Sequence, residues 1–195
     1  MNPAVLCLCV LPVCTARPQS ANVRQLRDLS TCWAEYYAAV YRVPIELVEA
    51  IIEEESAWDP YAISSKGAVG IMQLMPGTAV RFGVHDRFRV DENIHGGVAY
   101  LAWLKCRFNG DFRLMTAAYY VGEYPIALRG LDYSSPDVLG YVQRVSRRYR
   151  AKRLESRGSA SQKKKVEVRN ETRSSFRLVI AVTHDGGSQC TACDH

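Results

Sequence analysis

The chain has 195 residues, enough for one well-packed domain with additional ends, and two full domains are not expected. Its hydrophobic content of 48% and charged content of 23% are ordinary for a globular protein and argue against a wholly disordered chain. The net charge of +5 is concentrated in one segment, because residues 144–173 hold 12 Lys or Arg against 3 Asp or Glu. We interpret this segment as a solvated helix face that leads into a tail. Attraction to nucleic acid, anionic lipid or an acidic wall polymer is the alternative.

Residues 1–16 form an apolar run that ends in small residues. The run is too short to cross a bilayer comfortably, because a spanning helix needs about 20 residues. We expect residues 1–16 to be an export signal that is removed, which would leave a mature chain without a transmembrane span, in the periplasm or secreted. No Lys or Arg precedes the run, so a start further upstream or a buried segment is the alternative.

Four cysteines follow the expected signal, namely Cys32, Cys106, Cys190 and Cys193. In an oxidising compartment they could pair as Cys32 with Cys106 and Cys190 with Cys193, but the sequence does not choose among the pairings that four cysteines allow. The CxxC pair at Cys190 lacks a second CxxC or a histidine pair at zinc spacing. We therefore expect no metal site and no cofactor.

Apolar residues recur at helical spacing from Val23 to Arg153, and turn-forming residues divide this stretch into short segments. The pattern predicts a mainly α domain over residues 17–155. A loop is expected from Trp58 to Val69. Helices are expected near 23–41, from Pro44 onward, and near 77–82, 91–108, 112–120 and 136–153, the last four beginning beside Thr78, Asp91, Asp111 and Ser135.

The composition changes after Arg153. Residues 155–165 are polar, small and charged, which is typical of a linker. Beyond them, residues 166–168 and 176–182 have the apolar character of two short strands, so a short C-terminal β-hairpin is possible. We expect residues 156–195 to be a basic linker and tail, whose hairpin would need to dock on the helical domain to be stable.

Glu55 differs from the other glutamates of the helix expected after Pro44. At about 100° per residue, it points from the middle of the apolar face, whereas Glu46, Glu49 and Glu53 point toward solvent. A carboxylate there loses hydration and lies at the negative end of the helix dipole, so we expect its pKa to rise. A raised pKa keeps a carboxyl group protonated near neutral pH, as a general acid requires. The alternative is a glutamate at a frayed helix end that turns to water.

The sequence from Glu55 onward resembles a known family. Residues 55–79 read ESAWDPYAISSKGAVGIMQLMPGTA, an ordered pattern similar to the signature of the soluble lytic transglycosylases, lysozyme-like enzymes of bacterial wall turnover. Downstream, Asn93-Ile94, Ala118-Tyr119 and Tyr141-Val142 continue the pattern in order. The resemblance covers about residues 44–145 and implies a lysozyme-like helical domain.

The resemblance implies that Glu55 is the catalytic acid. It would protonate the oxygen of the β-1,4 bond between N-acetylmuramic acid and N-acetylglucosamine in peptidoglycan. The same residue would then act as base on the muramic C6 hydroxyl, whose internal attack gives a 1,6-anhydro product without water. Glycosidases generally use two carboxylates. Outside Glu55, the matched motifs offer no second carboxylate at a core position, and a nucleophile supplied by the sugar makes one carboxylate sufficient.

The resemblance also implies substrate-binding residues. Ser64 and Gln73 would hydrogen-bond the sugars and their N-acetyl groups, and Met72 would form an apolar wall near the acid. Tyr119 and Tyr141 would line the site, with Tyr141 within hydrogen-bonding reach of Glu55. Met72 could instead be plain core and Tyr141 a packing residue.

Tyr120 departs from the family pattern, which usually reads Ala-Tyr-Asn-Ala-Gly where this chain has Ala118-Tyr119-Tyr120-Val121-Gly122. A phenol cannot reproduce both the donor and the acceptor of an amide from the same place. Tyr120 is therefore placed among the substrate-binding residues as a change that affects rate or subsite preference.

The expected function is that of a lytic transglycosylase acting on peptidoglycan glycan strands. One alternative is a hydrolytic lysozyme-like glycosidase in which Asp59, Glu123 or another carboxylate activates water. Another is a glycan-binding component of an envelope-spanning secretion or conjugation apparatus, with catalysis weakened by Tyr120. The basic segment could dock on such an apparatus. It lacks a recognised DNA-binding motif, so nucleic acid is not expected as a partner.

Overall fold

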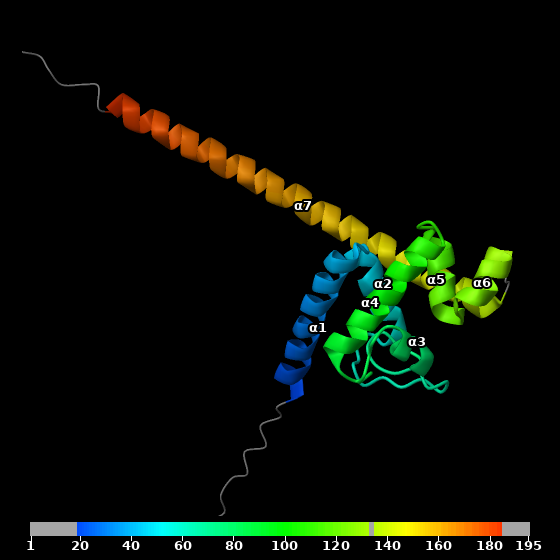
Figure 1. Ribbon diagram of the computed structural model, residues 1–195. Coiled ribbons are helices and arrows are strands. Elements are labelled where there is room, and N and C mark those ends of the chain that lie inside the picture. The colour runs from blue at the N-terminus through cyan, green and yellow to red at the C-terminus, as the bar shows by residue number, and fades with distance from the viewer. Residues whose placement is uncertain (1–18, 133–134, 185–195) are drawn as a thin grey trace, which may run out of the picture. The chain divides into compact units, whose positions relative to one another are not determined.

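The computed structural model describes residues 19–132 and 135–184, which fall into two compact units that divide between Gly110 and Asp111. Unit 1 holds α1 (Gln19–Tyr41), α2 (Ile45–Glu55), α3 (Pro76–Arg81) and α4 (Val90–Arg107) (Figure 1). Unit 2 holds α5 (Phe112–Val121), α6 (Glu123–Arg129), the 3-10 helix η1 (Gly130–Asp132) and α7 (Pro136–His184). The described chain is mainly helical, as the sequence predicts. The expected export signal, Cys190 and Cys193 lie outside the described residues.

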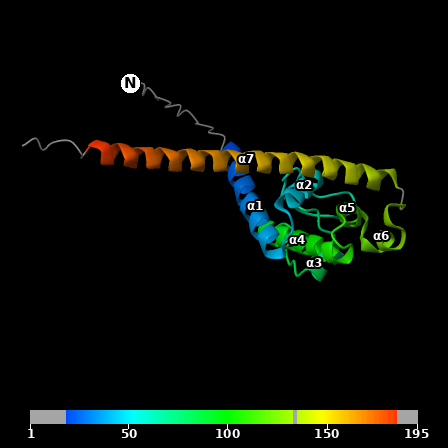
Figure 2. The same cartoon turned by 90° about the horizontal axis from the view of Figure 1, so that it is seen from above.

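In unit 1, α1 packs along α4 and also contacts α2, as Figure 1 and Figure 2 show from two directions. One face of α2 is buried and supplies much of the core: Leu47, Val48, Ala50, Ile51 and Ile52. The matching buried side of α4 includes Ile94, Val98, Leu101 and Leu104. These positions follow the helical spacing of apolar residues, which is why the sequence predicts both helices.

A loop of residues 56–75 joins α2 to α3. Antiparallel bridges pair Ile63 with Val69 and Val69 with Leu74, so the loop folds back on itself twice. The backbone N–H of Gly70 also donates to the carbonyl of Ala62 at 2.9 Å. The predicted loop from Trp58 to Val69 is part of this segment, and its folding is held by backbone hydrogen bonds rather than by a regular sheet.

Two expected helix starts have different outcomes. Asp111 caps α5 as predicted, because its Oδ1 accepts from the backbone N–H groups of Arg113 at 2.9 Å and Leu114 at 3.2 Å. The start expected beside Thr78 is wrong, since α3 begins at Pro76. Proline suits the first helical position because the N–H that it lacks would have no partner there.

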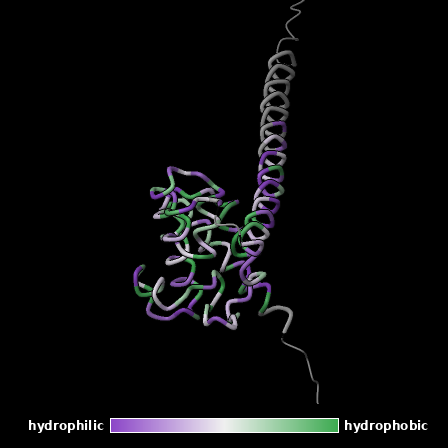
Figure 3. Tube along the Cα trace, turned by 90° about the vertical axis from the view of Figure 1, so that its right-hand side faces the viewer, coloured by the Kyte–Doolittle hydropathy of each residue, from purple (hydrophilic) through white to green (hydrophobic). Residues whose placement is uncertain are grey.

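The long helix α7 corrects two further expectations. It runs for 49 residues, so the expected linker after residue 155 and both strands of the possible hairpin lie inside one helix. Residues 137–184 contain no proline, and Lys, Arg, Gln and Glu, frequent in this stretch, are good helix formers. A composition typical of a linker is thus also compatible with an exposed helix. Figure 3 shows hydrophilic residues recurring along the coloured part of α7.

Cys32 and Cys106 are both free and exposed, so the disulfide considered between them is not formed. Within residues 19–132 and 135–184, no helix combines the length and the apolar character that a membrane span requires.

Candidate active site

Glu55 is the last residue of α2 and is half-buried. The two isoleucines that precede it on the apolar face, Ile51 and Ile52, are completely buried. The last carbonyl groups of a helix carry a partial negative charge, and partial burial removes water from a carboxyl group. The raised pKa of Glu55 that the sequence predicts stays a prediction.

Ser56 fixes the end of α2 directly after Glu55. Its backbone N–H donates to the carbonyl of Ile52 at 3.1 Å, which closes the last turn of the helix. Its hydroxyl donates to the carbonyl of Ile71 at 2.7 Å and accepts from the backbone N–H of Trp58 at 3.1 Å. Ser56 therefore ties the helix end that carries Glu55 to the far side of the loop.

Trp58 anchors the backbone that follows. Its indole N–H donates to Glu53 Oε2 at 2.7 Å, and the guanidinium of Arg27 lies 5.0 Å from the ring centroid. Trp58 is 7% exposed, so most of its side chain is buried and anchors the loop to α2. Ala57 and Trp58 have φ values of 51° and 71°. Such a conformation costs a non-glycine residue about 1–3 kcal/mol and persists where the surroundings fix it.

Gln73 has both of its amide hydrogens committed within the loop. Nε2 donates to the carbonyls of Ala62 and Gly70, each at 2.9 Å. The backbone of Gln73 has a φ of 50°, again in the left-handed region. The side-chain oxygen Oε1 is consequently the atom that Gln73 can offer to a ligand, as an acceptor. A bond from Gln73 to a sugar, as the sequence predicts, would be accepted at this oxygen.

Ser64 closes a turn in the same loop. Its hydroxyl oxygen accepts from the backbone N–H of Ala68 at 2.9 Å, and its own N–H donates to the carbonyl of Ala68 at 2.9 Å. Ser64 is half-buried, and its hydroxyl hydrogen is the group that it could donate to a sugar. The predicted sugar-binding role of Ser64 stays a prediction.

Met72 is completely buried, and its backbone N–H donates to Oδ1 of Asn93 at 2.8 Å. The amide of Asn93 donates in turn to the carbonyls of Val69 at 2.9 Å and Arg87 at 2.6 Å. A Cβ atom on Gly97 would collide with the sulfur of Met72, so α4 approaches this side chain closely. Met72 is thus part of the unit 1 core. Asn93, 1% exposed on α4, is a buried connection that sequence reasoning missed, although a polar residue on an apolar helix face signals it.

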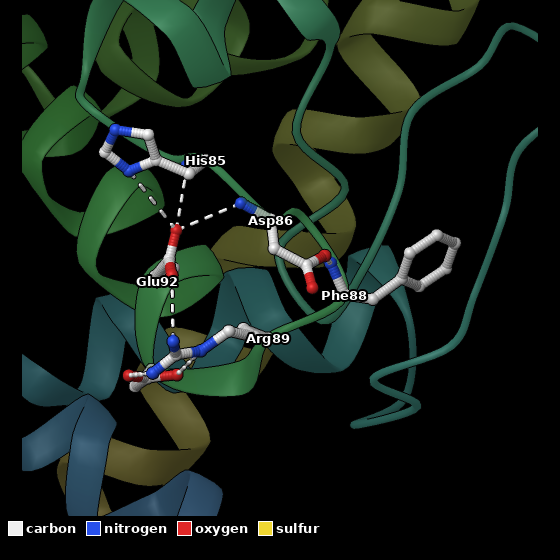
Figure 4. Close-up of polar contacts among 6 residues, drawn as sticks. His85, Asp86, Phe88, Arg89 and Glu92 are labelled. Carbon is white, nitrogen blue, oxygen red and sulfur yellow. Dashed lines mark hydrogen bonds and ion pairs between the residues drawn. The ribbon is translucent and has the colours of Figure 1, made fainter.

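The first turn of α4 holds the segment before it (Figure 4). Glu92 Oε2 accepts from the backbone N–H groups of His85 at 2.7 Å and Asp86 at 3.0 Å. The bonds from Asp86 and His85 lower the pKa of Glu92 from its ordinary value. Arg89 donates from Nη2 to Asp91 Oδ2 at 2.7 Å, and this hydrogen bond lowers the pKa of Asp91.

The tyrosines expected at the site lie in unit 2. The rings of Tyr120 and Tyr141 stack, with centroids 4.6 Å apart and planes inclined by 20°. Tyr141 is buried and Tyr120 is 41% exposed, while Tyr119, the preceding residue of α5, is half-buried. The predicted hydrogen bond between Tyr141 and Glu55 joins residues of the two units and stays a prediction.

Among the described residues, no three His, Cys, Asp or Glu side chains come together as potential metal ligands. A cavity of about 350 Å³ opens in unit 1 between the first half of α1 and the loop after α2. Its lining includes Leu26 and Arg27 on one side and Trp58 and Tyr61 on the other.

Residues 32–130, just over half of the chain, match the family model of the transglycosylase SLT domain. The chain is 48% identical over 64 residues to membrane-bound lytic murein transglycosylase F of Desulfosudis oleivorans, covering 33% of this chain and 14% of that protein. It is 38% identical over 85 residues to the transglycosylase of Enterobacteria phage PRD1, covering 44% of this chain and 32% of that protein.

Among solved structures, the chain is similar to lytic transglycosylase Slt from Pseudomonas aeruginosa, in an inactive mutant with glutamine in place of a glutamate. The TM-score is 0.55 at 28% identity, over 60% of this chain and 23% of that one. The chain thus spans no more than about a third of the length of these relatives. The fold predicted from the sequence, mainly α and lysozyme-like, is confirmed. The chain belongs to the transglycosylase SLT domain family.

Proposed function

We propose that this protein is a lytic transglycosylase that cleaves the glycan strands of peptidoglycan. The observation that carries the proposal is the match of residues 32–130 to the transglycosylase SLT domain, which includes Glu55 at the end of α2. Curated relatives named lytic murein transglycosylases support it. The inactive mutant of the similar Pseudomonas aeruginosa structure, a glutamate-to-glutamine exchange, supports a glutamate as the essential group.

The proposed reaction needs one carboxyl group and no water. Glu55 as the neutral acid donates its proton to the oxygen of the β-1,4 bond between N-acetylmuramic acid and N-acetylglucosamine, and the C1–O bond of the muramic residue breaks. The C6 hydroxyl oxygen of that residue attacks C1. The carboxylate of Glu55 takes the hydroxyl proton, which closes the 1,6-anhydro ring and restores the acid. The half-buried setting of Glu55 at a helix C-terminus favours the neutral form that the first step requires.

The other site residues are proposed to bind the glycan. Gln73 would accept a hydrogen bond from an N–H or O–H group of a sugar at Oε1, because its amide hydrogens are used within the loop. Ser64 would donate its hydroxyl hydrogen, and Met72 would support the loop from the core. Tyr119 and Tyr120 are also proposed as contacts for the glycan, with Tyr141 packed against Tyr120.

The test is mass spectrometry of the soluble products released from purified peptidoglycan by the parent and by Glu55→Gln. The proposal expects anhydro-muropeptides from the parent and none from Glu55→Gln. Glu46→Gln makes the same exchange in the first turn of α2 and serves as the control, with activity within about twofold of the parent. Products with reducing ends would instead indicate a hydrolase. A folded parent that binds glycan without cleaving it would indicate a binding component.

We further propose that the protein works in the periplasm or outside the cell, where its substrate lies, and that α7 serves as its contact to an envelope secretion or conjugation apparatus. The basic stretch of residues 144–173 supports such a contact through its charge. Deleting residues 156–195 is expected to abolish co-purification with envelope complexes while leaving release of soluble products unchanged. Unchanged association after the deletion would refute a role of the part of α7 that begins at residue 156.

A further inference from the structure

The loop that carries Met72 and Gln73 is bound to the segment before α4 by one arginine. Nη1 of Arg87 donates to the carbonyl of Gly67 at 2.9 Å and to the carbonyl of Leu74 at 3.0 Å. Gly67 and Leu74 lie at opposite ends of the stretch that turns back on itself around Val69. A single guanidinium group therefore closes the loop across its two ends.

Arg87 is itself held in place by α4. Its carbonyl accepts from Nδ2 of the buried Asn93 at 2.6 Å. The N–H of the preceding residue, Asp86, donates to Glu92, and Figure 4 shows Glu92 reaching from α4 to this segment. The backbone of Arg87 is thus fixed to a packed helix. Its side chain can therefore hold the loop in a fixed position relative to α4.

Gln73 depends on the closure of that loop. Its φ of 50° is unfavourable for a non-glycine residue and is maintained only by the surrounding contacts. Its amide hydrogens bond to Ala62 and Gly70, so the direction of Oε1 is set by the loop backbone. Leu74, the residue after Gln73, is one of the two carbonyl partners of Arg87. A change at Arg87 would reach Gln73 through one peptide unit.

We propose that Arg87 is a positioning residue for glycan binding, which acts by holding Gln73 with its Oε1 directed at the substrate. This inference rests on the proposed function, because it names the residue that orients a group of the same site. Arg87 itself is not placed in contact with the glycan. Its contribution is to keep Gln73 in one conformation. The binding conformation of Gln73 then exists before substrate binds, and binding does not have to pay for ordering it.

The experiment is a double-mutant cycle of Arg87→Met and Gln73→Ala, measured as kcat/KM for release of soluble products from peptidoglycan. If Arg87 acts through Gln73, each single change lowers kcat/KM by about tenfold to a hundredfold, and the double variant is no worse than Gln73→Ala alone. Two independent losses that multiply in the double variant would overturn the proposal. So would an Arg87→Met variant with the activity of the parent.

Arg87→Lys retains one charged donor and covers the case in which Arg87→Met fails to fold. It is expected to fold and to show an intermediate loss, since an ammonium group cannot reproduce the planar arrangement of guanidinium donors. Arg107→Met, at the exposed last turn of α4, is the matched control and keeps the activity of the parent within about twofold. A loss at Arg107→Met equal to that at Arg87→Met would also overturn the proposal.

The same cycle in the Glu55→Gln background, read as affinity for soluble peptidoglycan fragments, separates this inference from the proposed reaction. Even if the protein binds glycan without cleaving it, the affinities of the four variants can be measured. An affinity of the double variant that equals that of Gln73→Ala alone then supports the role of Arg87. Amide hydrogen exchange gives a second readout: Arg87→Met should accelerate exchange within residues 67–74 by about tenfold or more, with no change in α5. Unchanged exchange in the loop would refute the positioning role whatever the enzyme cleaves.

Discussion

Tyr120 stacks on Tyr141 with ring centroids 4.6 Å apart, and this contact gives a physical role to the residue that replaces the usual asparagine of the family. The outer ring is 41% exposed and the inner ring is 2% exposed, so Tyr120 covers Tyr141. Stacked aromatic pairs contribute about 0.5–1.5 kcal/mol beyond the area that they bury. The exchange of amide for phenol therefore brings an aromatic packing contact that an amide cannot make.

We predict that Tyr120→Asn lowers the free energy of unfolding by about 1 kcal/mol and lowers kcat/KM, because Tyr141 loses the ring that covers it. Tyr120→Phe keeps the stack and should match the parent within about 0.5 kcal/mol and about twofold in kcat/KM. Tyr124→Asn, at a tyrosine that is 74% exposed, is the control and should change little. Urea unfolding and product release measure both effects. Higher activity in Tyr120→Asn would show that the phenol impairs the site.

Ser56 supports a second prediction, since its hydroxyl joins the end of α2 to Ile71 at 2.7 Å. Ser56→Ala leaves the carbonyl of Ile71 and the N–H of Trp58 without this partner, which should cost about 1–3 kcal/mol of unfolding free energy. The activity should fall by about tenfold, because Glu55 precedes the released residue. Ser159→Ala, on the exposed part of α7, should stay within about 0.5 kcal/mol. Equal stability of the two variants would contradict the role of Ser56.

Gly97 allows α4 to approach Met72, and Gly97→Ala is predicted to destabilise the protein. The added methyl group would collide with the sulfur of Met72, and overpacking of this kind costs about 1–3 kcal/mol. Gly77→Ala is the matched control, because a Cβ atom at Gly77 in α3 meets only open space. That change should be neutral or stabilising by up to about 1 kcal/mol. Thermal unfolding of both variants tests the difference, and a neutral Gly97→Ala would show that Met72 moves aside.

The helices of unit 1 and the position of Glu55 could be predicted from the sequence because they depend on local patterns. Apolar residues at helical spacing define the buried face of α2, and Pro44 marks where it begins. The long helix α7 could not be predicted with the same rules. A polar stretch of Ser, Lys, Arg and Gln satisfies the composition of a linker as well as that of an exposed helix, so composition does not separate them.

The connections that hold the loop could not be predicted because they join residues distant in the sequence. Asn93 bonds to Val69 and Met72, more than 20 positions earlier, and nothing in the local pattern around Asn93 names those partners. Arg87 similarly appears in the sequence as one charge among many. Its two carbonyl partners, Gly67 and Leu74, become neighbours only when the loop closes. The sequence thus names the residues that are proposed to bind substrate, but it does not name the residues that hold the loop in place.

Glu92 supplies a prediction on pH. Hydrogen bonds from the backbone of Asp86 and His85 lower its pKa in the folded protein below the unfolded value of about 4.3. A carboxyl group with a lowered folded pKa stabilises the fold above its unfolded pKa, and that stabilisation is lost as the pH falls through the folded pKa. The parent should therefore lose stability as the pH is lowered below about 4.3, in part through Glu92.

Glu92→Gln should remove this part of the pH dependence. The amide can still accept an N–H but carries no charge, so the variant should be less stable than the parent at about pH 7, where Glu92 is ionised. The difference should shrink as the pH falls toward about 3, because the parent then loses the same charge. Glu46→Gln, the same exchange on α2, serves as the control for a general change in charge. Urea unfolding across this range measures the unfolding free energy of the parent and of Glu92→Gln as a function of pH. If the difference between them stays constant from about pH 7 to about pH 3, the charge of Glu92 does not hold the segment before α4.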